Sequence, residues 1–294
     1  MTSVTTTAGW SSGRVRAYVA LIKPRIIELL LITTVPAMVL AAQAWPGTWL
    51  VVATLLGGIM SAGGANAINN VVDRDIDSRM DRTRRRPLPT RSLGVGEALA
   101  VGIVLGVGGF VWLWLTTTLL AGLLATAALV FYVLVYTMFL KRTTPQNIVI
   151  GGAAGAVPAL VGWAAVTGTL ALPAWVLFAV VFFWTPPHFW ALALQFEEDY
   201  ARAGVPMLPV VSGERMTTLQ ITLYAAVVGG VSLMLQPAAD LGGLYLWSAV
   251  GLGLAFVAVA ATLLRDRSRA MMVFRFSNIY LTLLFSAVML DVML

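Results

Sequence analysis

The chain has 294 residues, of which 59% are hydrophobic and only 11% are charged. Its mean hydropathy of +0.88 excludes an ordinary water-soluble globular protein. The chain contains no cysteine, which excludes disulfides, iron–sulfur clusters and cysteine-bound zinc. These limits favour a protein that lies almost entirely inside a lipid bilayer.

Nine apolar stretches along the chain have the length of a transmembrane helix, which is about 20 residues. Their approximate ranges are 26–45, 48–68, 96–115, 118–139, 148–167, 172–194, 217–236, 243–264 and 275–294. We therefore predict an all-α membrane protein with nine transmembrane helices in a single bundle. The Ser/Thr-rich residues 1–20 are predicted to be a flexible cytoplasmic tail, so that the folded domain covers residues 21–294.

Basic residues are confined to one side of this predicted bundle. If the N-terminus is cytoplasmic, all 19 Lys and Arg residues fall in the tail or in cytoplasmic connections, as the positive-inside rule requires. The net charge of +6 then reflects membrane topology, and we expect no nucleic-acid partner. The predicted location is the cell inner (plasma) membrane, with the C-terminus outside.

Four polar residues recur at intervals of four where the second apolar stretch meets an arginine cluster. They are Asn69, Asp73, Asp77 and Asp81. On an α-helix this spacing stacks the side chains on one face, and such carboxylates suit Mg²⁺ ions that a diphosphate bridges. The simpler alternative is a solvated loop with i,i+4 ion pairs such as Asp75 with Arg79. That alternative does not explain Asn69 and Asp73, which extend an apolar span.

Basic residues near these acids are candidates for binding the phosphates. Arg86 precedes Pro87, and Lys141 and Arg142 follow a tyrosine-rich span that contains Tyr136. Cations at such positions would stabilise a departing diphosphate. The alternatives are that Arg86 only follows the positive-inside rule, and that Lys141 and Arg142 only anchor their helix.

A second acidic patch follows the sixth apolar stretch, where Glu197, Glu198 and Asp199 are consecutive. If the two patches hold opposite ends of one metal–diphosphate, the second patch supplies further metal ligands. The predicted metal ligands are therefore Asp73, Asp77, Asp81, Glu198 and Asp199. The alternative for the second patch is a solvated helix end.

The only histidine of the chain, His188, directly follows Pro186 and Pro187. We expect the two prolines to interrupt the helix and to leave room for a cavity. Aromatic neighbours of His188 suit a flat apolar ligand, but they also fit an ordinary interfacial aromatic belt. A structural hydrogen bond is the alternative role for the histidine. The predicted residues for binding a second ligand are His188, Arg142 and Tyr136.

These residues carry a resemblance to the UbiA superfamily of intramembrane prenyltransferases, since Asn69-x3-Asp73-x3-Asp77 matches its first aspartate-rich motif. From about residue 17 to the C-terminus, the chain also resembles one family within it, the protohaem IX farnesyltransferases (haem O synthases). The segments that carry this likeness are Lys23-Pro24-Arg25, 69–81, 86–89, 147–168, 187–195 and 199–211. Ala203 departs from the superfamily's second Asp-x3-Asp motif, as this family characteristically does, and Ala159 stands where a proline is expected.

The resemblance implies a bundle of helices around a central cavity that opens to lipid. It implies Mg²⁺ as cofactor, farnesyl diphosphate and haem B as substrates, and haem O as product. The catalytic residues that the motifs favour are Asn69, Asp73, Asp77, Arg86 and Lys141. Membrane lipid and a downstream haem-modifying membrane enzyme are the expected partners. The alternatives are a related enzyme that prenylates a quinone precursor, and a small-solute transporter.

Overall fold

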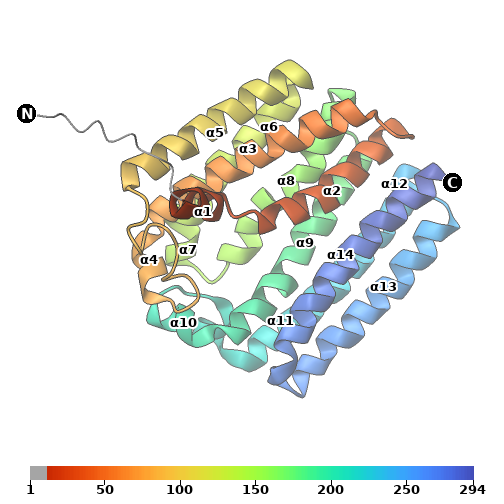
Figure 1. The fold of residues 1–294 in the computed structure, drawn as a ribbon. Helices are drawn as coiled ribbons and strands as arrows, with labels where there is room; N and C mark the ends of the chain where they lie inside the picture. The colour runs from red at the N-terminus through yellow and green to blue at the C-terminus, as the bar shows by residue number, and fades with distance from the viewer. Residues whose placement is uncertain (1–11) are drawn as a thin grey trace, which may run out of the picture.

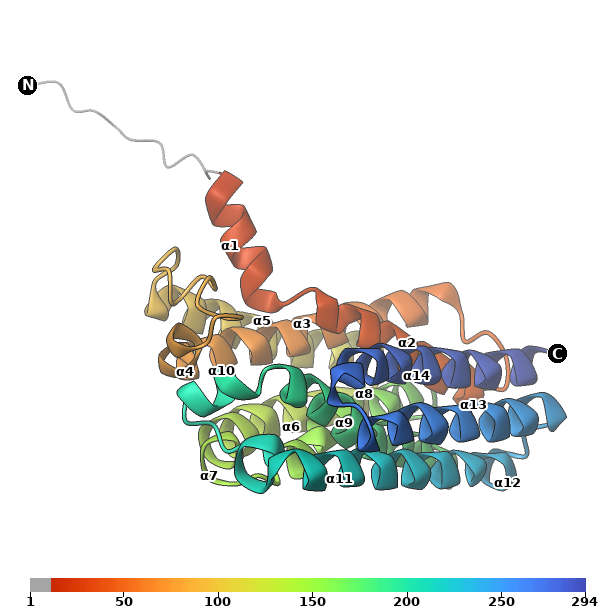
Figure 2. The same cartoon turned by 90° about the horizontal axis from the view of Figure 1, so that it is seen from below.

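The computed structural model describes residues 12–294, apart from the side chains of residues 12 and 25–31. Within this part of the chain all regular elements are helical, and they lie side by side in one bundle (Figures 1 and 2). The elements are α1 (Ser12–Ile22), α2 (Arg25–Ala42), α3 (Thr48–Val72), α4 (Arg74–Arg79), α5 (Val95–Thr116), α6 (Leu119–Val130), the π-helix η1 (Phe131–Leu140), α7 (Lys141–Thr143), α8 (Asn147–Thr167), α9 (Leu172–Gln195), α10 (Glu197–Arg202), α11 (Leu208–Leu233), α12 (Leu235–Ala239), α13 (Gly243–Ala261), the 3₁₀-helices η2 (Thr262–Leu264) and η3 (Arg267–Arg269), and α14 (Ala270–Met293).

Eight helical segments of the described chain are long and apolar enough to cross a membrane. They correspond to eight of the nine predicted spans, which confirms an all-helical membrane protein. The remaining predicted span, residues 26–45, overlaps the 18-residue helix α2, whose side chains are described only from Ile32 to Ala42. The ninth crossing therefore stays a prediction.

The predicted tail, residues 1–20, differs from the structure over residues 12–20, which belong to α1. This helix extends away from the bundle, as the view in Figure 2 shows. The rest of the predicted tail lies outside the described residues.

The central helix of the bundle is α9. It packs against α8, α11 and α14, and 67% of the residues in its most apolar 18-residue stretch are buried. On one side α3 lies along α5, and α6 joins α5 to α8. On the other side α13 and α14 complete the bundle next to α11 (Figure 1).

Glycine allows α3 and α5 to approach closely. A methyl group on Gly64 would lie 2.7 Å from the carbonyl oxygen of Gly102 and 2.7 Å from the backbone nitrogen of Gly106. Small residues of this kind are the usual means of packing helices in lipid, where close backbone contact replaces the hydrophobic driving force. This packing fixes the position of α3, whose last turn carries Asn69, the first residue of the acidic motif.

The two prolines of α9 do not interrupt it, so the predicted helix break at Pro186 and Pro187 is wrong. The helix is continuous from Leu172 to Gln195, and both prolines are buried in it. Packing against neighbouring helices holds the backbone in place despite the hydrogen bonds that proline cannot make. A break occurs instead in α11, where Gly213 adopts φ 74° and ψ 175°, a conformation that glycine tolerates best.

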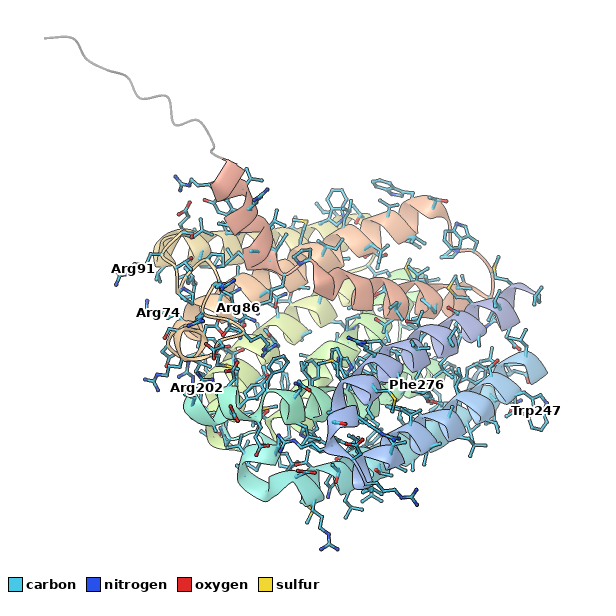
Figure 3. The ribbon with its side chains drawn as sticks, turned by 60° about the horizontal axis from the view of Figure 1, so that its bottom comes forward. Arg74, Arg86, Arg91, Arg202, Trp247 and Phe276 are labelled. Carbon is cyan, nitrogen blue, oxygen red and sulfur yellow. The ribbon has the colours of Figure 1, made fainter. Side chains whose placement is uncertain are left out.

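Most of the charged residues gather at one end of the bundle, which we call the charged end. It is the end at which α3, α7, α9 and α13 finish and α8, α11 and α14 begin. Figure 3 shows Arg74, Arg86, Arg91 and Arg202 near this end, whereas Trp247 lies near the opposite one. This agrees with the one-sided charge distribution predicted from the sequence.

Candidate active site

The last turn of α3 holds an acid within a network of polar side chains. Asp73 is fully buried and Asn69 is 2% exposed. The side-chain amide of Asn69 donates to Asp73 Oδ2 at 2.7 Å and to Thr137 Oγ1 at 3.1 Å. Lys141 donates to the same oxygen of Asp73. Residues from α3, η1 and α7 that are distant in sequence thus meet around one carboxylate.

Lys23 completes this network from the connection between α1 and α2. Its ammonium donates to Asn69 Oδ1 at 2.8 Å. Burial, followed by repulsion from Arg86, lowers the pKa of Lys23 to about 7. A partly buried amine that loses its proton so readily gains its charge again when a negatively charged ligand is bound nearby.

The next acid of the motif, Asp77, faces an arginine from the irregular segment that follows α4. Asp77 is 2% exposed, and Arg86 Nη1 lies 2.9 Å from both of its carboxylate oxygens. The backbone N–H of Asp77 donates to Asp73 O at 2.8 Å, so the helical spacing continues from α3 into α4. The predicted stacking of Asn69, Asp73 and Asp77 is therefore present.

The predicted stripe does not reach Asp81. Helix α4 ends at Arg79, and Met80 is extended with φ −103° and ψ 129°. Asp81 is consequently exposed, and it pairs with Arg84 and with Arg202. The exposed Asp75 does not form the i,i+4 ion pair with Arg79. Instead, both of its carboxylate oxygens accept hydrogen bonds from Arg142 at 2.8 Å. These hydrogen bonds lower the pKa of Asp75 to about 2.

The second acidic patch contributes one buried acid, Asp199. It accepts a hydrogen bond from the backbone N–H of Arg82 at 3.2 Å and pairs with Arg202 at 2.6 Å. Arg82 also donates to the hydroxyl of Tyr200 at 3.1 Å. Because Arg202 binds Asp81 as well, these contacts join the segment after α4 to α10.

The other two acids of this patch differ from Asp199. Glu198 is exposed, and it forms no ion pair with any of the described residues. Glu197 pairs with Arg267 at 2.6 Å. The structure thus brings Asp199 toward the segment that follows the first motif, but it does not bring Glu198 there.

Two tyrosines of η1 lie on the helix that also carries Thr137. The rings of Tyr132 and Tyr136 stack with their centroids 5.3 Å apart. The hydroxyl of Thr137 donates to the carbonyl oxygen of Tyr132, five residues earlier, at 2.8 Å. All three residues belong to a π-helix, a rare form that is frequent at functional sites.

Within the described residues, no three acids or histidines lie close enough together to hold a metal ion among them. The predicted five-ligand set, Asp73, Asp77, Asp81, Glu198 and Asp199, is therefore not one cluster in this structure. The reason is that the helix ends before Asp81, and that Asp81 and Glu198 are exposed whereas Asp73, Asp77 and Asp199 are buried. The donor chemistry nevertheless fits a hard cation, because Asp73 Oδ1 is buried without a hydrogen-bond partner.

His188 lies in the interior, between α9 and α14. Its ring stacks on Trp184 and Phe274, with centroids 4.3 and 4.4 Å away. Its Nδ1 lies 2.7 Å from Ser277 Oγ, and the hydroxyl of Ser277 donates to the carbonyl oxygen of Phe274. With the Ser277 hydroxyl directed to Phe274, the matching tautomer has the proton on Nδ1, which donates to Ser277, and has Nε2 as an acceptor.

Sequence reasoning missed several residues of the site. The sequence associates Lys23 only with the one-sided basic charge and with the resemblance, although a lysine directly before an apolar span is a usable signal. Thr137, Arg82 and Arg202 gave no signal of their own, because their contacts join segments that lie far apart in the sequence.

Fold and site together define a helical membrane protein with buried acids and bases gathered at one end of its bundle. Residues 30–284 match the UbiA prenyltransferase family. The chain belongs to this family. Protoheme IX farnesyltransferase of Symbiobacterium thermophilum is 56% identical over 282 residues, which are 95% of this chain and 94% of that protein. Protoheme IX farnesyltransferase 1 of Saccharopolyspora erythraea is 53% identical over 284 residues, which are 95% and 90% of the two chains.

Solved structures share this fold. A digeranylgeranylglyceryl phosphate synthase has a TM-score of 0.78 at 19% identity, and the match covers 95% of this chain and 98% of that one. A UbiA homolog from Archaeoglobus fulgidus bound to DMAPP and Mg²⁺ has a TM-score of 0.66 at 16% identity, with 92% and 99% covered.

Proposed function

We propose that this protein transfers the farnesyl group of farnesyl diphosphate to the 2-vinyl group of haem B, giving haem O and diphosphate. The observation that carries the proposal is the 50–56% identity to relatives named protoheme IX farnesyltransferase. The buried acids and bases at the charged end supply the chemistry that handling a diphosphate requires. In the reaction the bond between farnesyl C1 and oxygen breaks, a carbon–carbon bond to the vinyl group forms, and water adds to the remaining vinyl carbon.

Mg²⁺ fits this site and would neutralise the charge of the diphosphate when bound. In our proposal Asp73 and Asp77, one helical turn apart, hold it, and the buried Asp199 supplies a carboxylate for a cation at the other end of the diphosphate. The proposal gives no metal-binding role to Asp81 and Glu198, because both are exposed. The homolog with bound DMAPP and Mg²⁺ supports the use of a divalent cation in this fold.

The basic residues of the cluster bind the diphosphate in this proposal. Lys141 and Arg86 contact Asp73 and Asp77 directly, and Lys23 reaches Asn69. Cations held in place before the reaction stabilise the negative charge of the leaving group. Asn69 positions Asp73 and Lys23 through a hydrogen bond to each of them. The stacked rings of Tyr132 and Tyr136 keep water from the farnesyl carbon until the vinyl group attacks.

We place haem B on the side of His188, whose imidazole lies in a stack of flat rings with Trp184 and Phe274. An unprotonated Nε2 could accept a hydrogen bond or bind iron. The predicted role of Arg142 on this side receives less support, because Arg142 binds Asp75 and the carbonyl oxygen of Val72 at the charged end. Tyr136 stays a candidate for contact with either substrate.

We further propose that α2 supplies a ninth crossing, with the charged end cytoplasmic, the C-terminus outside, and the protein in the cell inner (plasma) membrane. The confinement of Lys and Arg to the connections of one end supports this orientation. A cytoplasmic charged end would receive farnesyl diphosphate from the aqueous side. A downstream haem-modifying membrane enzyme is the expected acceptor of the product.

The test is to incubate membranes that contain the protein with farnesyl diphosphate, haem B and Mg²⁺, and to separate the haems by chromatography. We expect haem O, and we expect its formation to stop when EDTA removes divalent cations. Prenylated 4-hydroxybenzoate without haem O would favour a quinone-precursor enzyme instead. Ion flux through proteoliposomes without any prenylated product would favour a transporter.

A further inference from the structure

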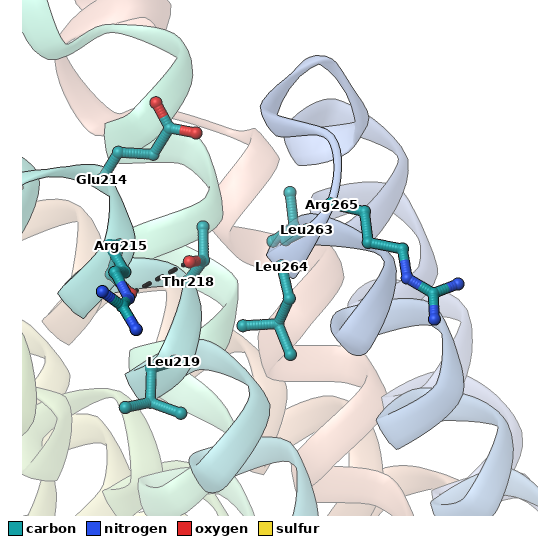
Figure 4. A pocket seen from close by; sticks show the side chains of 7 residues that line it. All are labelled: Glu214, Arg215, Thr218, Leu219, Leu263, Leu264 and Arg265. Atoms are coloured by element: carbon teal, nitrogen blue, oxygen red, sulfur yellow. Dashed lines mark hydrogen bonds between the residues drawn. The ribbon is translucent and has the colours of Figure 1, made fainter.

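A pocket of about 500 Å³ lies at the charged end, between the start of α11 after its kink and the segment 263–265, which covers the end of η2 and the residue after it (Figure 4). Residues from both segments line it, among them Arg215, Leu219, Leu264 and Arg265. None of these residues belongs to the acid–base cluster described above. The kink at Gly213 sets the direction in which the long part of α11 leaves this end.

The charge of this pocket is positive. Arg215 and Arg265 are exposed, and within the described residues neither of them pairs with a carboxylate. Glu214 also lines the pocket, and it shares Arg267 with Glu197, so the charged residues that line the pocket sum to one positive charge. Two unpaired guanidinium groups at the end of membrane-spanning helices suit a phosphate, which arginine can bind through two hydrogen bonds.

An apolar track leads away from the pocket along α11. Leu219, Leu223 and Val227 follow Arg215 at intervals of four, so the four side chains lie on one helix face. The three apolar side chains are exposed by 42%, 50% and 42%, and in a bilayer this face contacts lipid chains. A basic group above an exposed apolar track matches a molecule with an anionic head and a hydrocarbon tail.

We propose that this pocket binds the headgroup of an anionic phospholipid, whose acyl chain lies along Leu219, Leu223 and Val227. Basic pockets between transmembrane helices are a recurrent site for such headgroups. Charge complementarity favours an anionic lipid over a zwitterionic one. The track favours a lipid over free phosphate, which would use the two arginines alone.

The pocket is also linked to the helix that carries Asp199. Arg267 contacts Glu214 at 3.5 Å and Glu197 at 2.6 Å, and it donates to the carbonyl oxygen of Leu194 at 2.8 Å. These contacts connect the rim of the pocket to the end of α9 and the start of α10. A bound lipid is therefore expected to stabilise this end of the bundle against unfolding.

The experiment uses the full chain in detergent, with phosphatidylglycerol and phosphatidylcholine of identical acyl chains as probes. Native mass spectrometry measures how much of each lipid the protein retains. The wild type is expected to retain phosphatidylglycerol about tenfold better than phosphatidylcholine. The double variant Arg215→Gln/Arg265→Gln is expected to bind phosphatidylglycerol about 30-fold more weakly, which corresponds to about 1 kcal/mol for each lost charge.

The matched control is Arg91→Gln/Arg275→Gln, which removes the same charge from exposed arginines outside the pocket. The control variant should retain phosphatidylglycerol as well as the wild type does. In thermal unfolding, phosphatidylglycerol should stabilise only those proteins that contain both Arg215 and Arg265. If the double variant does not fold, each single variant is expected to lose about fivefold. Equal retention of both lipids by the wild type, equal loss in the control, or displacement of the lipid by millimolar inorganic phosphate would each overturn the proposal.

Discussion

Each buried acid of the site has a basic partner. Asp73 pairs with Lys141, Asp77 with Arg86, and Asp199 with Arg202. The cluster is thus nearly neutral as it stands, which lowers the cost of burying its charges. A metal–diphosphate brings charges of both signs, so the acids can exchange their basic partners for the metal while the bases turn to the phosphates.

Asp73→Asn and Asp77→Asn are each expected to lower kcat by about 100-fold or more, because each removes a charge that the diphosphate site requires. Volume changes little, so the thermal unfolding transition in detergent should remain. Haem O formation under saturating substrates measures the effect. The control is Asp75→Asn, which removes an exposed, paired carboxylate and should cost less than about fivefold. Equal losses at all three positions would contradict the assigned geometry.

Lys23 gives the site an expected pH dependence. Because its pKa is lowered to about 7, its ammonium form prevails only below that pH. If this ammonium binds the diphosphate, the affinity for farnesyl diphosphate falls as pH rises through 7. Arginine stays protonated, so Lys23→Arg should remove this fall between about pH 6 and about pH 9. Titration of binding at several pH values measures it, and identical profiles for both proteins would exclude Lys23 as the cause.

The spacing of the first motif predicted which side chains share a face only as far as the helix extends. Asn69, Asp73 and Asp77 meet this condition, whereas the backbone becomes extended at Met80 and turns Asp81 outward. The partners of these acids were not all predictable. Lys23 and Arg202 reach the site across many intervening residues, and no local pattern encodes such contacts.

At the level of elements, the position of Tyr136 depends on the helix packed against η1. A methyl group on Gly151 of α8 would overlap the ring of Tyr136, whereas a methyl group on Gly155 would have no atom within 4 Å. We expect Gly151→Ala to displace the ring and lower activity about tenfold, since small misplacements near the reacting groups are costly.

The control for this prediction is Gly155→Ala, one turn further along the same helix. It should leave activity unchanged and stabilise the protein by up to about 1 kcal/mol, because alanine favours helix over glycine. Haem O formation and thermal unfolding measure the two effects. Full activity in Gly151→Ala would mean that the ring of Tyr136 has no role.

Most helices could be predicted from the sequence because an apolar run of about 20 residues has few other structures available in lipid. The positions at which helices break could not be predicted. Pro186 and Pro187 are typical of a helix end, but tertiary packing keeps them within α9. Gly213 breaks α11, and the helical residues before it, 208–212, lie outside the predicted span 217–236.

For the whole molecule, the number of crossings determines where the ends of the chain lie. Helix α2 has 18 residues, which correspond to about 27 Å, close to the hydrocarbon thickness of a bilayer. With nine crossings the two termini lie on opposite sides of the membrane, and with eight they lie on the same side. Reporter proteins fused to each terminus, one active only in the cytoplasm and one only outside, distinguish the two cases. We expect opposite sides.

The one-sided distribution of basic residues also determines where a protease can act. Trypsin cleaves only after Lys or Arg, and the connections of the end opposite the charged one (residues 43–47, 117–118, 168–171 and 234–242) contain neither residue. In sealed vesicles, trypsin should therefore fragment the protein when it is added to the side of the charged end. From the other side it would find no bond to cleave, and the chain would remain intact.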